Sequence, residues 1–566
     1  MEIGRRKLLA ASALGAVGMT LTAGRALARG IGEPDLLVVN ANMYTVDPLQ
    51  PRARAVAVQG DRFVAVGSDS EMRALAGKRT RIVDAGGATI VPGFNDCHLH
   101  AEADILLYET LVGNPYEVEF VTIASIVDKL KGKASKTSPG EWVFGFFYDD
   151  TKVKDRRALT RADLDRVSTS HPVLVLHRGG HTALVNSKAF ALAGVNRDTP
   201  NPTGGTFDRD AEGELSGRVT DSAMDAFYRP DIMPSLGKAA DPARKREAAA
   251  FMSSQFARYG LTSVSHSGDD FAALQAIRAD GKLLHRISYE CDDAMLDHVI
   301  NAGIASGLGD EWIRLGATIE HSHDGSFSER TMALSRPYPG RTPPYSGNIV
   351  QPQEQLNAWA ERMYRAGIRP NIHANGDVAI DMALKAYEHA IAKMPKARLR
   401  PKITHCTYVN SDLIRRIKAV DAIPAPFTSY LYYNSDKFAF YGEEMMKNCL
   451  AFRSFLDAGI PVVAGSDFPP GPFSPLMGIQ GMVTRTGFDG HSWGENQRIT
   501  VEEAIGIYTL NGAVSTREEH IKGSITPGKL ADFVMLGDDP HAVQPSKIKD
   551  IEIVETYTGG QSVFHT

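Results

Sequence analysis

The sequence has little of what several classes of protein require. Its cysteines number only four, and their spacing fits neither a zinc knuckle nor a dense disulfide framework. A net charge of only -5 gives no basic footprint for nucleic acid or for an anionic membrane. No low-complexity stretch or long run of one charge predicts disorder. What remains is an ordinary globular balance, 43% hydrophobic and 23% charged, over 566 residues, enough for two or three structural units.

Long apolar runs are also absent, apart from one near the start. Residues 1–28 are predicted to be a signal peptide, since Arg5 and Arg6 precede an Ala-rich run and Ala26-Leu27-Ala28 forms a small-residue cleavage site. The paired arginines indicate the twin-arginine type. An uncleaved membrane anchor is the alternative, but the run is short. We therefore expect a periplasmic protein, exported by the twin-arginine machinery and free of the membrane after cleavage.

Strand-like runs occur near both ends of the chain. They lie at Asp35–Asn40, Ala55–Val58, Phe63–Val66, Asp532–Leu536 and Ile551–Val554. The second and third are separated by a Gly-Asp pair and predict a hairpin. We expect residues 29–90 and 516–566 to form one small β-sandwich domain built from both termini.

The centre alternates strand-like and helix-like stretches. The expected strands are Thr89–Phe94, Leu261–His266, His285–Tyr289, Ile313–Ile319, Pro370–His373, Lys402–His405, Ala422–Ala425 and Pro461–Ser466. Helices are expected at Gln353–Ala366, Val378–Ala392 and Ser411–Ala419. Eight such units predict an α/β protein with a TIM (β/α)8 barrel over residues 91–515. The interval from His100 to Leu261 is far too long for one connection, so we expect an inserted subdomain at about residues 106–258, after the first strand.

The sharpest chemical signal ends the first barrel strand. His98 and His100 stand two residues apart, and side chains alternate along a strand, so both point to the same face. At the carboxyl end of a barrel strand that face is the active site. Neutral imidazoles suit zinc and similar metals. An isolated His-x-His pair would more often be structural, and Cys97 between them is expected only to pack.

Further candidate ligands stand near the ends of later strands. His373, His405 and Asp467 each follow a strand-like run. The interval from His373 to His405 is about 30 residues, one βα unit, and that from His405 to Asp467 is about two. Each residue alone would more simply be a cap or a buried polar group. Together with His98 and His100 they predict a metal site.

Several motifs carry a resemblance to a known family. They are Pro92–His100, His373–Asp377, Gly465–Asp467, Gly523–Asp532 and, in the insertion, His181–Ser187. The chain resembles the amidohydrolase superfamily, and within it the amidohydrolase-3 group, over nearly all of its mature length. The resemblance implies His98 and His100 on one metal, His373 and His405 on a second, and Asp467 as both ligand and proton shuttle.

One position departs from the family pattern. Many relatives carry a lysine on strand four, four residues before an Asp-Gly pair, and its carboxylated form bridges two metals. Here the pair is Asp324-Gly325 and the earlier position holds Glu320. A glutamate already has a carboxylate, so we expect Glu320 to bridge without modification; the alternative is a lost bridge and a single metal.

Other histidines lie near these positions. His321 and His323 are expected to be polar and non-ligating, with His323 the less certain because strand regularity should fail near Gly325. His266 is expected to be an ordinary hydrogen-bonded histidine, with a place in the pocket as the alternative. His177 and His181 flank a Gly-Gly pair in the insertion. Close backbone approach there makes His181 a candidate for contact with a substrate carbonyl, and a structural turn is the alternative.

These expectations combine into one function. We expect a hydrolase of carbon–nitrogen bonds other than peptide bonds, acting on a small molecule such as an N-acyl or N-formyl amine, with one or two divalent ions, zinc favoured. Asp467 would move the proton and His181 would contact the carbonyl. Three alternatives stay open: a lactam, lactone or other cyclic substrate on the same site, a non-catalytic periplasmic binding or regulatory protein, and an envelope-tethered interaction protein. Homo-oligomerisation is also left open.

Overall fold

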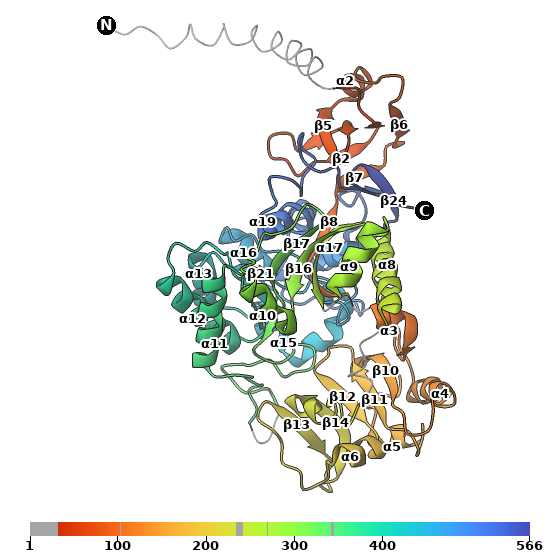
Figure 1. The fold of residues 1–566 in the computed structure, drawn as a ribbon, viewed down its shortest axis with the longest axis vertical. Helices are drawn as coiled ribbons and strands as arrows, with labels where there is room; N and C mark the ends of the chain where they lie inside the picture. Colours follow the sequence, from red (N-terminus) through yellow and green to blue (C-terminus); the bar gives the residue numbers. More distant parts are fainter. Residues whose placement is uncertain (1–31, 102, 234–240, 269, 341–343) are drawn as a thin grey trace.

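A computed structural model describes residues 32–101, 103–233, 241–268, 270–340 and 344–566 (Figure 1). The expected signal peptide, residues 1–28, lies outside the described residues. Within the described ranges, no helix is both long and apolar enough to cross a membrane. The mixed α/β class expected from the sequence is confirmed.

Two sheets lie together at one end of the molecule. The first has the order β5-β4-β1-β6, with β1 Leu36–Val39, β4 Ala55–Gln59, β5 Arg62–Gly67 and β6 Arg81–Asp84. The second has the order β24-β23-β22-β7-β2-β3, with β2 Asn42–Tyr44, β3 Arg52–Ala53, β7 Thr89–Pro92, β22 Phe533–Leu536, β23 Ile553–Thr558 and β24 Gln561–His565. Val38, Phe63, Phe533 and Tyr557 share one buried cluster, so strands from both ends of the chain build a common core.

Two parallel sheets form the centre. One has the order β17-β16-β15-β8, with β8 Phe94–His100, β15 Leu261–Gly268, β16 Arg286–Cys291 and β17 Ile313–Thr318. The other has the order β18-β19-β20-β21, with β18 His321–Ser322, β19 Asn371–Ala374, β20 Lys402–His405 and β21 Ile423–Ala425. These bounds agree with most of the expected strands to within two residues.

Hydrogen bonds join the two parallel sheets on both sides. On one side the Thr318 N–H donates to the Arg369 oxygen over 3.0 Å. On the other, Gly465 forms a parallel bridge with Phe427, which follows β21, and the Cys97 N–H of β8 donates to the Ala464 oxygen over 2.7 Å. The strands of these two central sheets therefore have their carboxyl ends at the same edge of the central part.

Helices follow the central strands. They include α8 Pro242–Arg258, α9 Phe271–Ala279, α10 Asp293–Asn301, α11 Gln353–Ala366, α12 Asp377–Lys393, α13 Ser411–Ala419, α14 Tyr430–Tyr433, α15 Gly442–Met446, α16 Phe452–Asp457, α17 Pro475–Thr484, α18 Val501–Gly506 and α19 Gly512–Thr516. In α11, Leu356, Ala360 and Met363 recur at helical spacing and are buried, so one apolar face packs inward. Gly367 ends this helix in the left-handed conformation, φ 71°.

A long segment with its own sheet separates β8 from β15. Its six-stranded sheet has the order β13-β14-β12-β11-β10-β9, with β9 Thr110–Leu111, β10 Val143–Tyr148, β11 Val173–His177, β12 Thr182–Val185, β13 Gly205–Arg209 and β14 Leu215–Asp221. The helices α3 Ala103–Tyr108, α4 Ile123–Ala134, α5 Arg161–Asp165 and α6 Ser187–Ala193 accompany it. In Figure 1 this yellow part lies at the end of the molecule opposite the two terminal sheets.

Two expected strands differ from the structure. The stretch Thr89–Phe94 is divided, because β7 pairs with β2 and β22 in the terminal sheet whereas Phe94 begins β8. Gly93 is the turning point between them. The stretch Pro461–Ser466 is not assigned as a strand, and only a bridge at Gly465 appears there. Val463 and Gly465 donate to the oxygens of Pro424 and Pro426, but these prolines have no N–H with which to complete the ladder.

Candidate metal centre and active site

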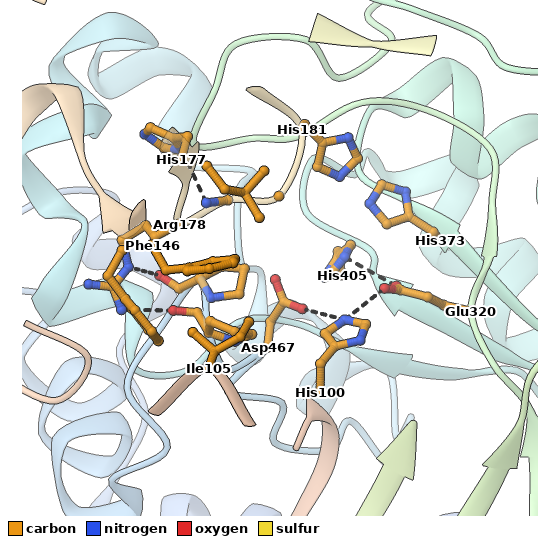
Figure 2. Close-up of a pocket in the computed structure, with 16 residues that line it drawn as sticks. His100, Ile105, Phe146, His177, Arg178, His181, Glu320, His373, His405 and Asp467 are labelled. Atoms are coloured by element: carbon orange, nitrogen blue, oxygen red, sulfur yellow. Dashed lines mark hydrogen bonds and ion pairs between the residues drawn. The ribbon is translucent and has the colours of Figure 1, made fainter. Parts of the chain in front are cut away.

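The expected site residues meet at the carboxyl ends of the central strands. His100, Glu320, His373, His405, Asp467 and His181 line one cavity of about 280 Å³. Figure 2 shows His100, Glu320, His405 and Asp467 turned toward one another, with His181 and His373 beside them. His98 lies directly behind, fully buried, with its Nε2 3.1 Å from Asp467 Oδ1. The structure thus brings together every residue that the sequence analysis proposed as ligand or catalytic group.

Two carboxylates face three imidazoles. Glu320 Oε1 lies 3.1 Å from His100 Nε2, and Glu320 Oε2 lies 3.4 Å from the Nε2 atoms of both His98 and His405. Asp467 Oδ1 lies 3.4 Å from His100 Nε2. Glu320 comes from the turn between β17 and β18, whereas the others come from β8, β20 and the segment after Ser466. The carboxylate of Glu320 therefore stands in the middle of the histidines.

This donor set fits a divalent cation. One ligand atom each from His98, Glu320, His405 and Asp467 lies within 4.8 Å of the other three. The buried Glu320 Oε2 forms no well-aligned hydrogen bond among the described residues, although two imidazole nitrogens lie 3.4 Å away, and a bound cation would compensate its charge. Imidazole nitrogens mixed with carboxylate oxygens are the ligands that zinc and similar ions take.

The ionisable groups of the cluster differ in charge. Burial lowers the pKa of His98 and of His100, but Glu320 and Asp467 outweigh it, so the pKa of His98 lies well above its ordinary value and that of His100 is raised to about 10. These two rings would have to release a proton to bind a metal. Burial raises the pKa of Glu320, but His98, His100 and His405 outweigh it and hold the pKa well below its ordinary value. Burial, against the opposing charge of Asp467, lowers the pKa of His405 to about 4, so this ring is neutral at pH 7. A carboxylate and a neutral imidazole are the forms that bind a metal.

His373 is held by a network that sequence reasoning left unassigned. Its Nδ1 lies 3.2 Å from Asp324 Oδ1, and its ring lies 4.5 Å from that of His405. Asp324 is fully buried and accepts hydrogen bonds from the N–H groups of Ala333, Asn375 and Gly376. A carboxylate behind a ligand histidine fixes the orientation of the ring.

Two site residues have strained backbones. His405 has φ 69° and Asp467 has φ 54°, the left-handed region that non-glycine residues seldom adopt. Each such conformation costs about 1–3 kcal/mol and persists where the surrounding structure imposes it. The Asp467 N–H donates to the His98 oxygen over 2.9 Å, which ties this turn to β8. Both residues with strained backbones therefore have side chains that line the cavity.

The inserted segment supplies His181 to the cavity. His181 Nδ1 lies 2.9 Å from Asp221 Oδ1, and the His181 N–H donates to Glu329 Oε1 over 3.1 Å. Burial lowers the pKa of His181, but Asp221 and the charge of Glu329 outweigh it and raise the pKa to about 9. A Cβ added at Gly179 would lie 1.9 Å from Glu329 Oε1, so only glycine allows this approach.

Three further histidines named in the sequence analysis are not among the residues that meet at the cluster. His321 stacks on Trp359 at 4.1 Å and hydrogen-bonds Gln351, away from the cluster, as expected. His266 Nε2 lies 2.8 Å from Asp270 Oδ1, which favours the ordinary hydrogen-bonded histidine over a place in the pocket. His323 is fully buried, and neither ring nitrogen has a hydrogen-bond partner among the described residues; we have no physical account of it.

A second cluster of possible ligand atoms joins Asp149, Asp150 and His177. Cations already compensate its carboxylates. Asp149 Oδ2 lies 3.0 Å from Lys437 Nζ, and Asp150 Oδ2 lies 2.8 Å from Arg330 Nη2. We therefore assign it as a set of ion pairs between the insertion and the central part, not as a metal site.

The wall opposite the metal-binding side is mainly apolar. Ile105, Phe146, Phe147, Leu176, Pro469 and Pro470 line it. Arg178 also lines it, but its guanidinium donates to the carbonyls of Asn114, Pro469 and Pro470 and to the Tyr433 hydroxyl. Four of its N–H donors are thus engaged by the protein, so Arg178 stabilises the structure around the cavity.

A cavity of histidines and carboxylates at the carboxyl ends of parallel strands is the arrangement of a metal-dependent hydrolase. The sequence model of the amidohydrolase family matches residues 81–564, and the chain belongs to that family. The resemblance inferred from the motifs is thereby confirmed.

Particular relatives span almost the whole chain. The chain is 25% identical to an N-substituted formamide deformylase of Arthrobacter pascens, over 93% of this chain and 97% of the relative. It is 28% identical to the putative amidohydrolase YtcJ of Bacillus subtilis (strain 168), over 92% and 98%. An uncharacterised metal-dependent hydrolase of Pyrococcus horikoshii OT3 has a similar structure, with TM-score 0.68 and 22% identity over 90% of this chain and 99% of that one.

Proposed function

We propose that this protein hydrolyses the carbon–nitrogen bond of a small amide, such as an N-acyl or N-formyl amine, at a divalent metal centre. The observation that carries the proposal is the convergence of Glu320 and Asp467 on His98, His100 and His405 at one cavity. The name of the Arthrobacter pascens relative supports a carbon–nitrogen bond as the target.

The residues that would hold the metal are His98, His100, Glu320, His373, His405 and Asp467, around one or two ions. The histidine content favours zinc. When bound, such an ion polarises a carbonyl and lowers the pKa of water. Glu320 is central because its Oε1 faces His100 and its Oε2 faces both His98 and His405, and it would be the carboxylate shared between the ions if two are bound.

Asp467 and His181 would act on the substrate. The Asp467 carboxylate can accept a proton from the attacking water and return it to the leaving nitrogen, since it lines the cavity beside His98 and His100. His181, on the other side of the cavity, would hydrogen-bond the substrate carbonyl oxygen. The apolar wall of Ile105, Phe146 and Leu176 would hold the substituent and limit access of water.

The surrounding architecture is part of the proposal. The two parallel sheets and the segment 461–467 would close a (β/α)8 barrel within residues 91–515, supported by the hydrogen bonds between the sheets. The two terminal sheets, within residues 29–90 and 516–566, would form a β-sandwich around their shared core. The insertion, at about residues 106–258, would form the roof of the active site.

We also propose that the protein acts in the periplasm. The support is the sequence of residues 1–28, with Arg5 and Arg6 before an apolar run and an Ala-Leu-Ala site. Export of an already folded chain would allow the metal to be bound before transport.

The test joins metal analysis to a substrate screen. Purified protein is expected to contain one to two equivalents of divalent metal and to hydrolyse members of a panel of N-formyl and N-acetyl amines. His98→Gln should lose metal and activity together, whereas His389→Gln, which alters a surface histidine paired with Glu361, should lose neither. Full activity after removal of all metal would contradict the proposal, and hydrolysis of lactams or lactones alone would move the substrate to that class.

A further inference from the structure

The insertion presents one histidine to the cavity through a defined carboxylate contact. His181 immediately precedes β12, and β12 pairs antiparallel with β14 in the register Thr182 with Thr220. This register sets His181 opposite Asp221, the last residue of β14. The Asp221 N–H donates to the His181 oxygen over 2.9 Å, and the Asp221 carboxylate lies 2.9 Å from His181 Nδ1.

The backbone of Asp221 has a strained conformation at this position. Its φ of 46° and ψ of -129° lie outside the regions that ordinary residues favour. Strain of this kind at the edge of a cavity points to a function for the side chain. The second carboxylate oxygen accepts a hydrogen bond from Asn348 Nδ2 over 2.8 Å, so both oxygens are engaged.

One long connection of the central part also contacts His181 and Asp221. Asn348 and Glu329 both belong to the long connection between β18 and α11, and Glu329 holds the backbone of His181. The ring of His181 lies 5.5 Å from that of His373. With Nδ1 occupied by Asp221, Nε2 is the ring nitrogen left for a molecule in the cavity.

We propose that Asp221 is a positioning residue for His181: its carboxylate accepts a hydrogen bond from the Nδ1–H and so directs the Nε2–H of the same ring at the carbonyl oxygen of the bound amide. The inference rests on the proposed function, because it assigns the substrate to His181. Asp221 itself does not touch the reacting atoms. Its hydrogen bond selects one orientation of the ring, as a carboxylate behind a catalytic histidine does elsewhere.

The decisive variant is Asp221→Gly. Glycine adopts the φ of this position more readily than aspartate, so the melting temperature should stay near that of the wild type while the carboxylate is lost. We expect kcat to fall roughly 10- to 100-fold with KM changed little and metal content unchanged. Asp208→Asn is the matched control, since it removes a carboxylate of the same sheet that pairs with Arg218; its kinetics should match the wild type.

A double variant separates positioning from a general structural effect. If Asp221 acts through His181, then His181→Ala with Asp221→Gly should be no slower than His181→Ala alone. Multiplied losses would overturn the proposal, and so would wild-type kcat in Asp221→Gly. A wild type that cleaves no amide would instead contradict the proposed function.

A readout without turnover tests the same contact. In protein labelled with ¹⁵N-histidine, the His181 signals, identified by their loss in His181→Ala, should show protons on both ring nitrogens, with the Nδ1–H hydrogen-bonded. Asp221→Gly should change that pattern, and Asp208→Asn should not. Identical His181 signals in wild type and Asp221→Gly would overturn the inference whatever the substrate proves to be.

Discussion

Glu320 is a single side chain placed where many relatives use a modified lysine. Its two oxygens lie within 3.4 Å of the Nε2 atoms of three histidines, and the buried Oε2 forms no well-aligned hydrogen bond among the described residues. A glutamate needs no carbon dioxide to acquire its carboxylate. Metal loading of this protein should therefore be independent of added bicarbonate.

Glu320→Gln tests this assignment at the level of one atom. The amide keeps the size of the side chain but removes the negative charge that two neighbouring cations would share. We expect metal affinity to fall on the order of 10- to 100-fold, the second ion to be lost first, and kcat to drop with it. Metal content and kcat would be measured beside Glu311→Gln, which removes a surface carboxylate paired with Arg62. Unchanged values for Glu320→Gln would favour a single-metal site or a ligand role for His323.

His285 gives the molecule a pH dependence away from the active site. The Ser253 hydroxyl accepts a hydrogen bond from the Leu284 N–H and lies within hydrogen-bond distance, 2.9 Å, of His285 Nδ1. The other nitrogen, Nε2, is buried without a partner among the described residues, and the ring lies 5.0 Å from Phe256. Burial, aided by the charge of His266, lowers the pKa of His285 to about 3.

The sign of the effect follows from where the protons bind. Between pH 6.5 and 3 the unfolded chain is protonated at this position and the folded chain is not, so the free energy of unfolding falls as pH decreases below 6.5. From pH 7 to pH 5 this single group should remove about 2 kcal/mol. In His285→Gln the fall in melting temperature between these pH values should be smaller by the corresponding amount. An equal fall in both proteins would show that His285 is protonated in the folded state.

At the scale of elements, Gly93 marks the point where the chain leaves the terminal sheets for the central ones. It lies between β7 and β8, and a Cβ there would be 2.0 Å from the Oγ1 of the buried Thr262 on β15. Gly93→Ala should therefore force β8 and β15 apart, at a cost of about 1–3 kcal/mol.

A glycine-to-alanine substitution in the helix α4 should instead increase the stability of the protein. Gly132 lies on α4 with nothing within 4 Å of an added Cβ, so Gly132→Ala should stabilise that helix by about 0.5–1 kcal/mol. Thermal unfolding of the two variants beside wild type compares them directly. A Gly93→Ala protein as stable as the wild type would mean that Thr262 moves aside without loss.

Elements with a strong local pattern were predicted well. The helices α11 and α13 begin and end where the sequence analysis expected, because their apolar residues recur at helical spacing and Asn410 caps α13. The stretch Pro461–Ser466 was predicted less well, since an apolar run shows that a segment is buried but not how its neighbours pair with it. The same limit explains why Thr89–Phe94 was not divided at Gly93.

At the scale of the whole molecule, the export proposal concerns residues outside the described ranges. Arg5→Lys together with Arg6→Lys should retain the protein in the cytoplasm, because the twin-arginine pathway recognises the pair. The exported wild type should begin near Arg29, as determined by N-terminal sequencing after fractionation. A variant of the same charge elsewhere, Lys188→Arg, should be exported normally. Periplasmic protein that still carries Met1 would contradict cleavage.

The sequence by itself determined the metal-binding candidates. His98, His100, His373, His405 and Asp467 could be found because each follows an apolar strand, and the carboxyl ends of parallel strands meet at one edge whatever the details of packing. Glu320 could be found because its distance from Asp324-Gly325 matched a family pattern.

Only the tertiary structure decided which groups support that cluster. Asp221 faces His181 because β12 pairs with β14, and Glu329 reaches it because a long connection folds over the insertion. Asp324 is held by three backbone N–H groups that donate to its carboxylate, and its Oδ1 lies 3.2 Å from His373 Nδ1. Carboxylates in loops and at strand ends look alike in a sequence, since their partners are chosen by strand register and loop path, and these depend on contacts between residues far apart along the chain.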